Sequence, residues 1–107
     1  MKTFKWKLNF DFLEEDQRPK EQAKWFENAL IGALISRYKD GVSISNQRLL
    51  FNIINKIELS EKGLPNDTVT LEDAEFELIK EAFMNGKFNP AGFRVSCQIA
   101  KNIDEAT

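Results

Sequence analysis

The sequence contains no histidine and only one cysteine, Cys97. Without imidazole, Ser-His-Asp and Cys-His catalysis are excluded, as is every zinc site that uses histidine. A single thiol forms neither an intrachain disulfide nor a thiolate metal site, and it is typical of a reducing compartment. Because Cys97 lies between the apolar residues Val95 and Ile99, we predict that it is buried as a small hydrophobic residue. We expect no metal ion and no enzymatic activity based on a thiol or an imidazole.

Clustered glycines and long apolar runs are also missing. The five glycines are scattered, so neither a phosphate-binding loop nor a dinucleotide fingerprint is present. The longest apolar stretch, Ala29 to Ile35, is too short to cross a bilayer. Residues Met1 to Phe12 hold no continuous apolar segment of the kind found in signal peptides. We expect no cofactor, no membrane contact and a cytoplasmic location.

The composition is that of one globular domain, residues 1–107, with 42% hydrophobic and 30% charged residues. The 15 basic and 17 acidic residues give a net charge of −2, which does not favour a nucleic-acid-binding protein. Aromatic residues are in excess, with nine phenylalanines and two tryptophans. They predict an aromatic core, or a contact surface where part of the set is exposed.

The N-terminal segment alternates strictly between apolar and polar residues. This period of two predicts a half-buried strand with one largely aromatic face. A lone strand leaves its backbone groups unpaired, so a second strand from elsewhere in the chain must join it. The apolar positions are Phe4, Trp6, Leu8, Phe10 and Phe12.

Three helices are predicted before residue 87. Acidic residues followed by proline favour a first helix from about Pro19 to Lys39, which Asp40-Gly41 ends. The residues at helical spacing that form its predicted core stripe are Ala23, Phe26, Ala29, Leu30, Ala33 and Leu34. Ser43 or Ser45 caps a second helix, whose apolar stripe runs from Leu49 to Ile57.

A loop is predicted next, because Leu59 to Asp67 contains glycine, proline and asparagine. A short strand at Thr68 and Val69 is one reading of the following residues. The run Thr70-Leu71-Glu72-Asp73 resembles a capping box and starts a third helix, which Asn85-Gly86 ends.

The last segment, residues 90–104, fits two patterns. Asn89-Pro90 is typical of a helix start, and Val95 and Ile99 lie on one helical face. Apolar residues also alternate from Phe93 to Ile99, which is typical of a strand. We favour the helix; a strand here would be the natural partner of the N-terminal one. The predicted fold class is α+β, with an N-terminal aromatic strand in a small sheet packed against three or four helices.

Several apolar residues fall outside the core stripes of the first two helices. Exposed aromatic and aliphatic side chains that cluster mark interaction sites, so this set predicts a protein interface or a self-association surface. The alternative is that the first helix is buried on two sides. The residues are Trp25, Ile31, Ile35, Tyr38 and Phe51.

A basic sheet face is the second candidate site. Lys2, Lys5, Lys7 and Arg94 would form it if the last segment lay beside the first strand, and they would contact nucleic acid. The aromatic residues of the strand point to the opposite face, which weakens this hypothesis. Exposed lysines on a strand also simply discourage edge pairing.

Carboxylate chemistry is the third possibility. Two of Asp11, Glu14, Glu15 and Asp16 inside one pocket would support a carboxylate-dependent enzyme. The simpler interpretation is that these acids complement the dipole of the following helix. The acids of the third helix are interpreted as a solvated face, with a DNA-mimicking surface as the alternative.

Two-thirds of the chain resembles small proteins encoded by tailed bacteriophages, most of them uncharacterised. The matching features are an apolar helix, a second helix with apolar residues and lysine, a Val-Thr-Leu-acid start of the third, and a short closing segment. The aromatic strand and Leu64-Pro65-Asn66 depart from that pattern. The matching residues are Phe26 to Ile35, Gln47 to Ile57, Val69 to Asp73, Leu78 to Lys80 and Phe88 to Ile103.

The resemblance implies a viral accessory protein that acts by binding, in the host cytoplasm. We therefore predict a non-catalytic protein-protein interaction protein that binds a host or viral protein, or itself, and that inhibits a host enzyme or defence system. A small nucleic-acid-binding module is the alternative.

Overall fold

A computed structural model of the chain describes residues 1–37, 40–63, 68–86 and 92–107. A two-stranded antiparallel sheet packs against four α-helices in this part of the chain, which confirms the predicted α+β class. None of the helices in these ranges combines the length and apolar character needed to cross a bilayer. The elements, in order, are β1 (Lys2–Lys5), the 3-10 turn η1 (Glu15–Gln17), α1 (Gln22–Arg37), α2 (Ile44–Gly63), β2 (Thr68–Leu71), α3 (Asp73–Asn85) and α4 (Phe93–Asp104).

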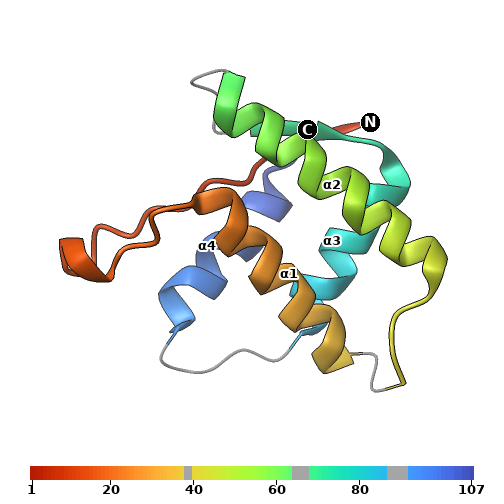
Figure 1. Ribbon diagram of the computed structural model, residues 1–107, viewed down its shortest axis with the longest axis horizontal. Coiled ribbons are helices and arrows are strands. Elements are labelled where there is room, and N and C mark those ends of the chain that lie inside the picture. Colours follow the sequence, from red (N-terminus) through yellow and green to blue (C-terminus); the bar gives the residue numbers. More distant parts are fainter. Residues whose placement is uncertain (38–39, 64–67, 87–91) are drawn as a thin grey trace.

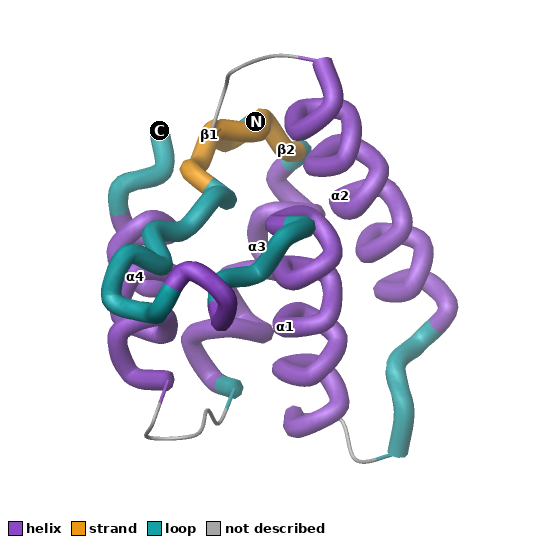
Figure 2. Tube along the Cα trace, turned by 60° about the vertical axis from the view of Figure 1, so that its left-hand side comes forward, coloured by secondary structure: helices purple, strands orange, loops and turns teal. Residues whose placement is uncertain are grey.

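The sheet lies at one end of the helices (Figures 1 and 2). Helices α1 and α3 occupy the middle of the molecule, with α2 on one side and α4 on the other. Helix α3 packs against all three other helices, while α4 also contacts β1. The core therefore lies around α1 and α3, and one side of α2 remains at the surface.

Strand β1 is shorter than the alternation predicts. It pairs with β2 only over Lys2–Lys5, because β2 is four residues long, with Phe4 opposite Val69. Burial nevertheless alternates as far as Phe10, and only Phe12, 39% exposed, leaves the pattern. Beyond the ladder, Asn9 is held by a side chain: its N–H donates to Gln98 Oε1 and its carbonyl accepts from Gln98 Nε2, both at 2.8 Å.

Helix α1 begins at Gln22, three residues later than predicted. The acidic run forms the separate turn η1, and Arg18 after it is extended, as expected for a residue that precedes proline. The Arg18 side chain closes this segment by donating from Nε to the Leu13 carbonyl at 3.1 Å.

Helix α2 runs to Gly63, so the predicted loop start at Leu59 was wrong. The helix continues this far because no helix-breaking residue precedes Gly63.

Helix α3 is capped by Glu72 rather than Thr70, because Thr70 and Leu71 belong to β2. Glu72 and Glu75 form a reciprocal capping box, in which the Glu72 N–H donates to Glu75 Oε1 at 2.9 Å. Glu75 is only 3% exposed, and Lys56 Nζ of α2 lies 2.6 Å from the same carboxylate oxygen. This ion pair ties α2 to the start of α3.

The last segment is a helix, as favoured, and not a strand. Its buried residues are Ile99 and Ile103, four positions apart. Cys97 lies on the opposite side and is exposed, so the prediction of a buried cysteine was wrong. Two residues separate same-face neighbours on a strand, but on a helix they turn the side chain by about 200°.

The core joins β1, α1 and α3 through aromatic contacts. Phe26 of α1 lies at the centre, with ring centroids 6.1 Å from Phe4 and 5.5 Å from Phe83. Phe76 packs edge-on against Phe4 at 6.3 Å. The aromatic face of the N-terminal segment therefore forms part of the core, as predicted.

Candidate functional site: an apolar groove between α1 and α2

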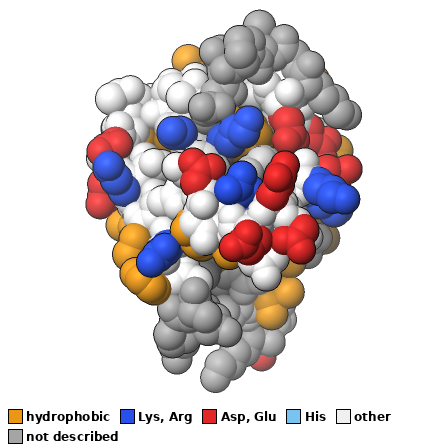
Figure 3. Space-filling view, turned by 90° about the vertical axis from the view of Figure 1, so that its left-hand side faces the viewer, with side chains coloured by type: hydrophobic (Ala, Val, Ile, Leu, Met, Phe, Trp, Pro, Cys, Tyr) orange, Lys and Arg blue, Asp and Glu red, His pale blue; other side chains and the backbone are white. Residues whose placement is uncertain are grey.

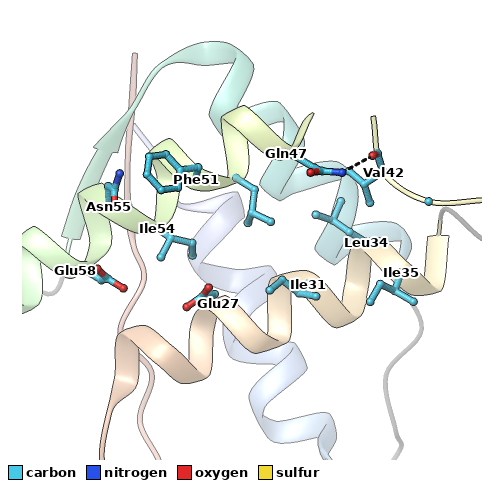
Figure 4. A pocket seen from close by; sticks show the side chains of 12 residues that line it. Glu27, Ile31, Leu34, Ile35, Val42, Gln47, Phe51, Ile54, Asn55 and Glu58 are labelled. Carbon is cyan, nitrogen blue, oxygen red and sulfur yellow. Dashed lines mark hydrogen bonds between the residues drawn. The ribbon is translucent and has the colours of Figure 1, made fainter. Parts of the chain in front are cut away.

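A groove of about 630 Å³ lies between α1 and α2, which run antiparallel (Figure 4). Its floor contains Leu34 and Ile54, which lie between the two helices, and Leu50 also lines it. Ile35 of α1 and Phe51 of α2 form parts of its walls, and they are 63% and 67% exposed. Single exposed apolar side chains are normal on a protein surface, but a contiguous cluster of them marks an interaction site.

The groove exists because α1 is apolar on two sides. One side buries Phe26, Leu30 and Leu34 in the core, as the helical stripe predicts. Ile31 and Ile35 turn toward the groove instead. Folding needs only the first side, so the second is available for another contact.

The two ends of the groove differ in charge. Glu27 of α1 and Glu58 of α2 lie at one end, where both carboxylates are near the space between the helices (Figure 4). Lys24 pairs with Glu27 at 3.4 Å, but its side chain is 60% exposed and the pair is weak. One end of the groove is therefore acidic.

The other end is fixed by backbone contacts. Gly41 has a φ of 101°, a conformation that glycine adopts without strain. Gln47 Nε2 donates to the Val42 carbonyl at 2.9 Å, and Ser43 Oγ accepts from the Asn46 N–H at 3.2 Å. These bonds cap α2 and hold Val42 at the groove edge.

Three of the five residues predicted for a protein interface, Ile31, Ile35 and Phe51, line this groove. Trp25 lies elsewhere: it is half-buried against the core, with its ring 5.2 Å from Phe10 in a T-shaped contact. Tyr38 lies outside the described residues. Sequence reasoning missed Val42, although its position just before the Ser43 cap is typical of a residue that packs at a helix entrance.

The four predicted nucleic-acid contacts do not share one hollow. Lys5 and Lys7 line one together with Arg18, while Lys2 lines another at the far side of β1 beside α3 and α4. Arg94 lies over the ring of Phe12, 5.5 Å from its centroid. Acidic and basic side chains are interspersed on the face shown in Figure 3. This distribution does not favour the basic-face hypothesis.

The acidic residues do not converge either. Asp11, Glu14, Glu15 and Asp16 are all exposed. Among the described residues, no group of three carboxylates or thiols could hold a metal ion.

The pKa of one carboxyl, that of Asp73, is lowered by an ion pair. The terminal ammonium of Met1 lies 2.9 Å from Asp73 Oδ1 and lowers the pKa of that carboxyl below its usual value.

No family model, no curated protein and no solved structure matches this chain. The geometry of the groove is therefore the main guide to function.

Proposed function

We propose that this chain is a non-catalytic protein-interaction protein that binds a helix of a partner protein in the groove between α1 and α2. The observation that carries the proposal is the pair Ile35 and Phe51, both more than 60% exposed on either side of an apolar floor. A surface of this kind gains free energy when a partner removes it from water.

The shape of the groove suits a helix. Two antiparallel helices leave a furrow between them, and a third helix packs there with its apolar side chains between theirs. From Glu27 to Ile35 the groove wall on α1 measures about 12 Å, slightly more than two helical turns. We expect apolar anchors spaced three or four residues apart on the partner.

The acidic end defines the polarity of the partner. Glu27 and Glu58 favour a lysine or arginine where the partner leaves the groove on that side. Charge at an interface mainly sets orientation and association rate, so the apolar anchors provide most of the affinity.

The resemblance to proteins of tailed bacteriophages supports a viral accessory role in the host cytoplasm. A protein that inhibits a host enzyme or defence system by binding needs a shaped surface and no catalytic residues. The exposed groove agrees with such a role. The affinity capture described next is designed to identify the host enzyme or defence system that this protein binds.

The test is affinity capture from a bacterial lysate with the unaltered chain and with Ile35→Lys. The matched control is Phe93→Lys, which changes an exposed apolar residue, 59% accessible, on α4. We expect a captured protein that Ile35→Lys loses and Phe93→Lys retains. Equal capture by Ile35→Lys, with an unchanged circular dichroism spectrum, would contradict the proposal.

A further inference from the structure

The outward face of α2 carries a second apolar stripe. Ile44, Phe51 and Leu59 are 69%, 67% and 70% exposed. They are seven and eight residues apart, so they lie along one side of the helix over about 22 Å. Ile53 and Ile57, both fully buried, lie on the opposite side. Only Phe51 of the outward stripe also lines the groove.

We propose that a second copy of this chain covers this stripe, with the two α2 helices antiparallel around a two-fold axis. The stripe is symmetric about the midpoint between Phe51 and Asn52. A two-fold axis at that point places Ile44 of one copy opposite Leu59 of the other and brings the two Phe51 rings side by side. Such self-complementarity is the requirement of an isologous dimer interface.

Charges along the stripe agree with this register. Arg48 and Asn55 lie on the same face as the apolar residues, seven positions apart. The two-fold axis sets Arg48 opposite Asn55 of the second copy, so that no like charges meet there. Glu58 of that copy, one helical turn further, is the nearest acid for the guanidinium. Antiparallel helices also align their dipoles favourably.

The available area predicts a weak dimer. A specific interface covers about a tenth of a small protein's surface, which for 7060 Å² is about 700 Å² per protomer. The three apolar side chains supply on the order of 350 Å², and the exposed residues Arg48, Asn52 and Asn55 add to it. This is near the lower limit for a specific interface, so we expect dissociation in the micromolar range.

The first test is the mass in solution, measured by sedimentation equilibrium from roughly 1 μM to 1 mM. The mass is expected to rise from one chain, 12.4 kDa, toward two. Because each copy contributes one substituted residue, Leu59→Glu places two buried charges in the dimer interface. We expect it to raise the dissociation constant at least about tenfold. Phe93→Glu on α4 is the control and should leave it unchanged. A monomer at the highest concentration, or an unchanged constant for Leu59→Glu, would overturn the proposal.

The second test is the register. In a Cys97→Ser background, Arg48→Cys/Asn55→Cys should form a disulfide-linked dimer on oxidation, because the two positions face each other. Neither single variant should do so. A link through Arg48→Cys alone would indicate parallel helices and contradict the arrangement.

The dimer interface and the partner-binding groove share Phe51, so the tests use residues that belong to only one of the two surfaces. Leu59 and Ile44 do not line the groove, whereas Ile35 does and is absent from the stripe. Ile35→Lys is expected to abolish partner capture and to leave the mass unchanged. Loss of dimerisation in both Ile35→Lys and Leu59→Glu would instead assign self-association to the groove, against the arrangement proposed here.

Discussion

Helices α2 and α3 lie side by side and bury similar apolar stripes, yet their outward faces differ. On α3, the positions that face solvent are mostly polar or charged, such as Glu77 and Lys80, while Met84 near its C-terminal end is 43% exposed. This pattern is typical of a helix that completes a core. On α2, solvent meets Ile44, Phe51 and Leu59. One apolar face per helix is enough to fold this chain. The second apolar face on α2 therefore indicates a contact with another molecule.

The largest expected effect separates the two faces of α2 itself. Ile57 is fully buried and Leu59, two residues on, is 70% exposed. Ile57→Ala should lower the free energy of unfolding by about 3–4 kcal/mol, through lost burial and a cavity. Leu59→Ala should change it by less than about 0.5 kcal/mol. Urea unfolding at low protein concentration measures both. Similar losses would show that the outward stripe supports the fold.

The next effect concerns the ion pair between α2 and α3. Lys56→Met leaves the Glu75 carboxylate, 3% exposed, without its cation. Because the lysine side chain is itself 36% exposed, we expect a cost of about 2 kcal/mol. Glu58→Met, on the groove side of the same helix, is the control and should cost less than about 0.5 kcal/mol. The double variant Lys56→Met/Glu75→Met removes the buried charge as well, so it should be more stable than Lys56→Met alone. If it is not, the carboxylate is stabilised mainly by its capping bond.

A smaller effect is expected where Gln98 replaces a strand partner for Asn9. Gln98→Ala removes both 2.8 Å hydrogen bonds at an accessible site and should cost about 1 kcal/mol. Gln98→Glu keeps the acceptor and loses the donor, so it should lie in between. Hydrogen exchange at the Asn9 amide reports on the site directly. Unchanged protection in Gln98→Ala would mean that packing of Leu8 and Phe10 alone holds the segment.

The smallest effect is the pH dependence of Asp73. The Met1 ammonium lowers the pKa of its carboxyl in the folded state, so the contribution to stability is present above the unfolded pKa. It is lost as the pH falls through the folded value. Asp73→Asn should flatten this part of the stability profile, and acetylation of the Met1 amine should do the same. An NMR titration of the Asp73 carboxyl that shows an ordinary pKa would disprove the contact.

Periodicity predicted most of the buried set and part of the groove. The stripe of α1 and the alternation from Phe4 to Phe10 both match the observed burial, because each depends only on local backbone geometry. Features set by distant residues were missed. The end of the β1 ladder depends on the length of β2, and the burial of Trp25 depends on Phe10, fifteen residues earlier.

The candidate site shows the same limit. Ile31, Ile35 and Phe51 were identified because they fall outside the core stripes, which is a local property. They line one groove because of how α1 and α2 pack against each other. The spacing of residues within either helix does not predict that packing. Of the outward stripe of α2, the sequence pattern predicts only Phe51, because Leu59 falls in the expected loop and Ile44 lies between the two candidate helix caps.

The bonds between Asn9 and Gln98 join residues 89 positions apart. Strand β1 likewise pairs with β2, which comes more than sixty residues later in the chain. Thr3 also exchanges backbone hydrogen bonds of 2.9 and 3.0 Å with Thr107. During synthesis, the aromatic segment at residues 4–10 therefore leaves the ribosome well before β2 and α4, whereas α1, which covers part of it through Phe26 and Trp25, follows more closely. Contacts so distant in sequence slow folding, and they leave the segment only partly covered, and so exposed to chaperones or to aggregation, until the last helix has emerged.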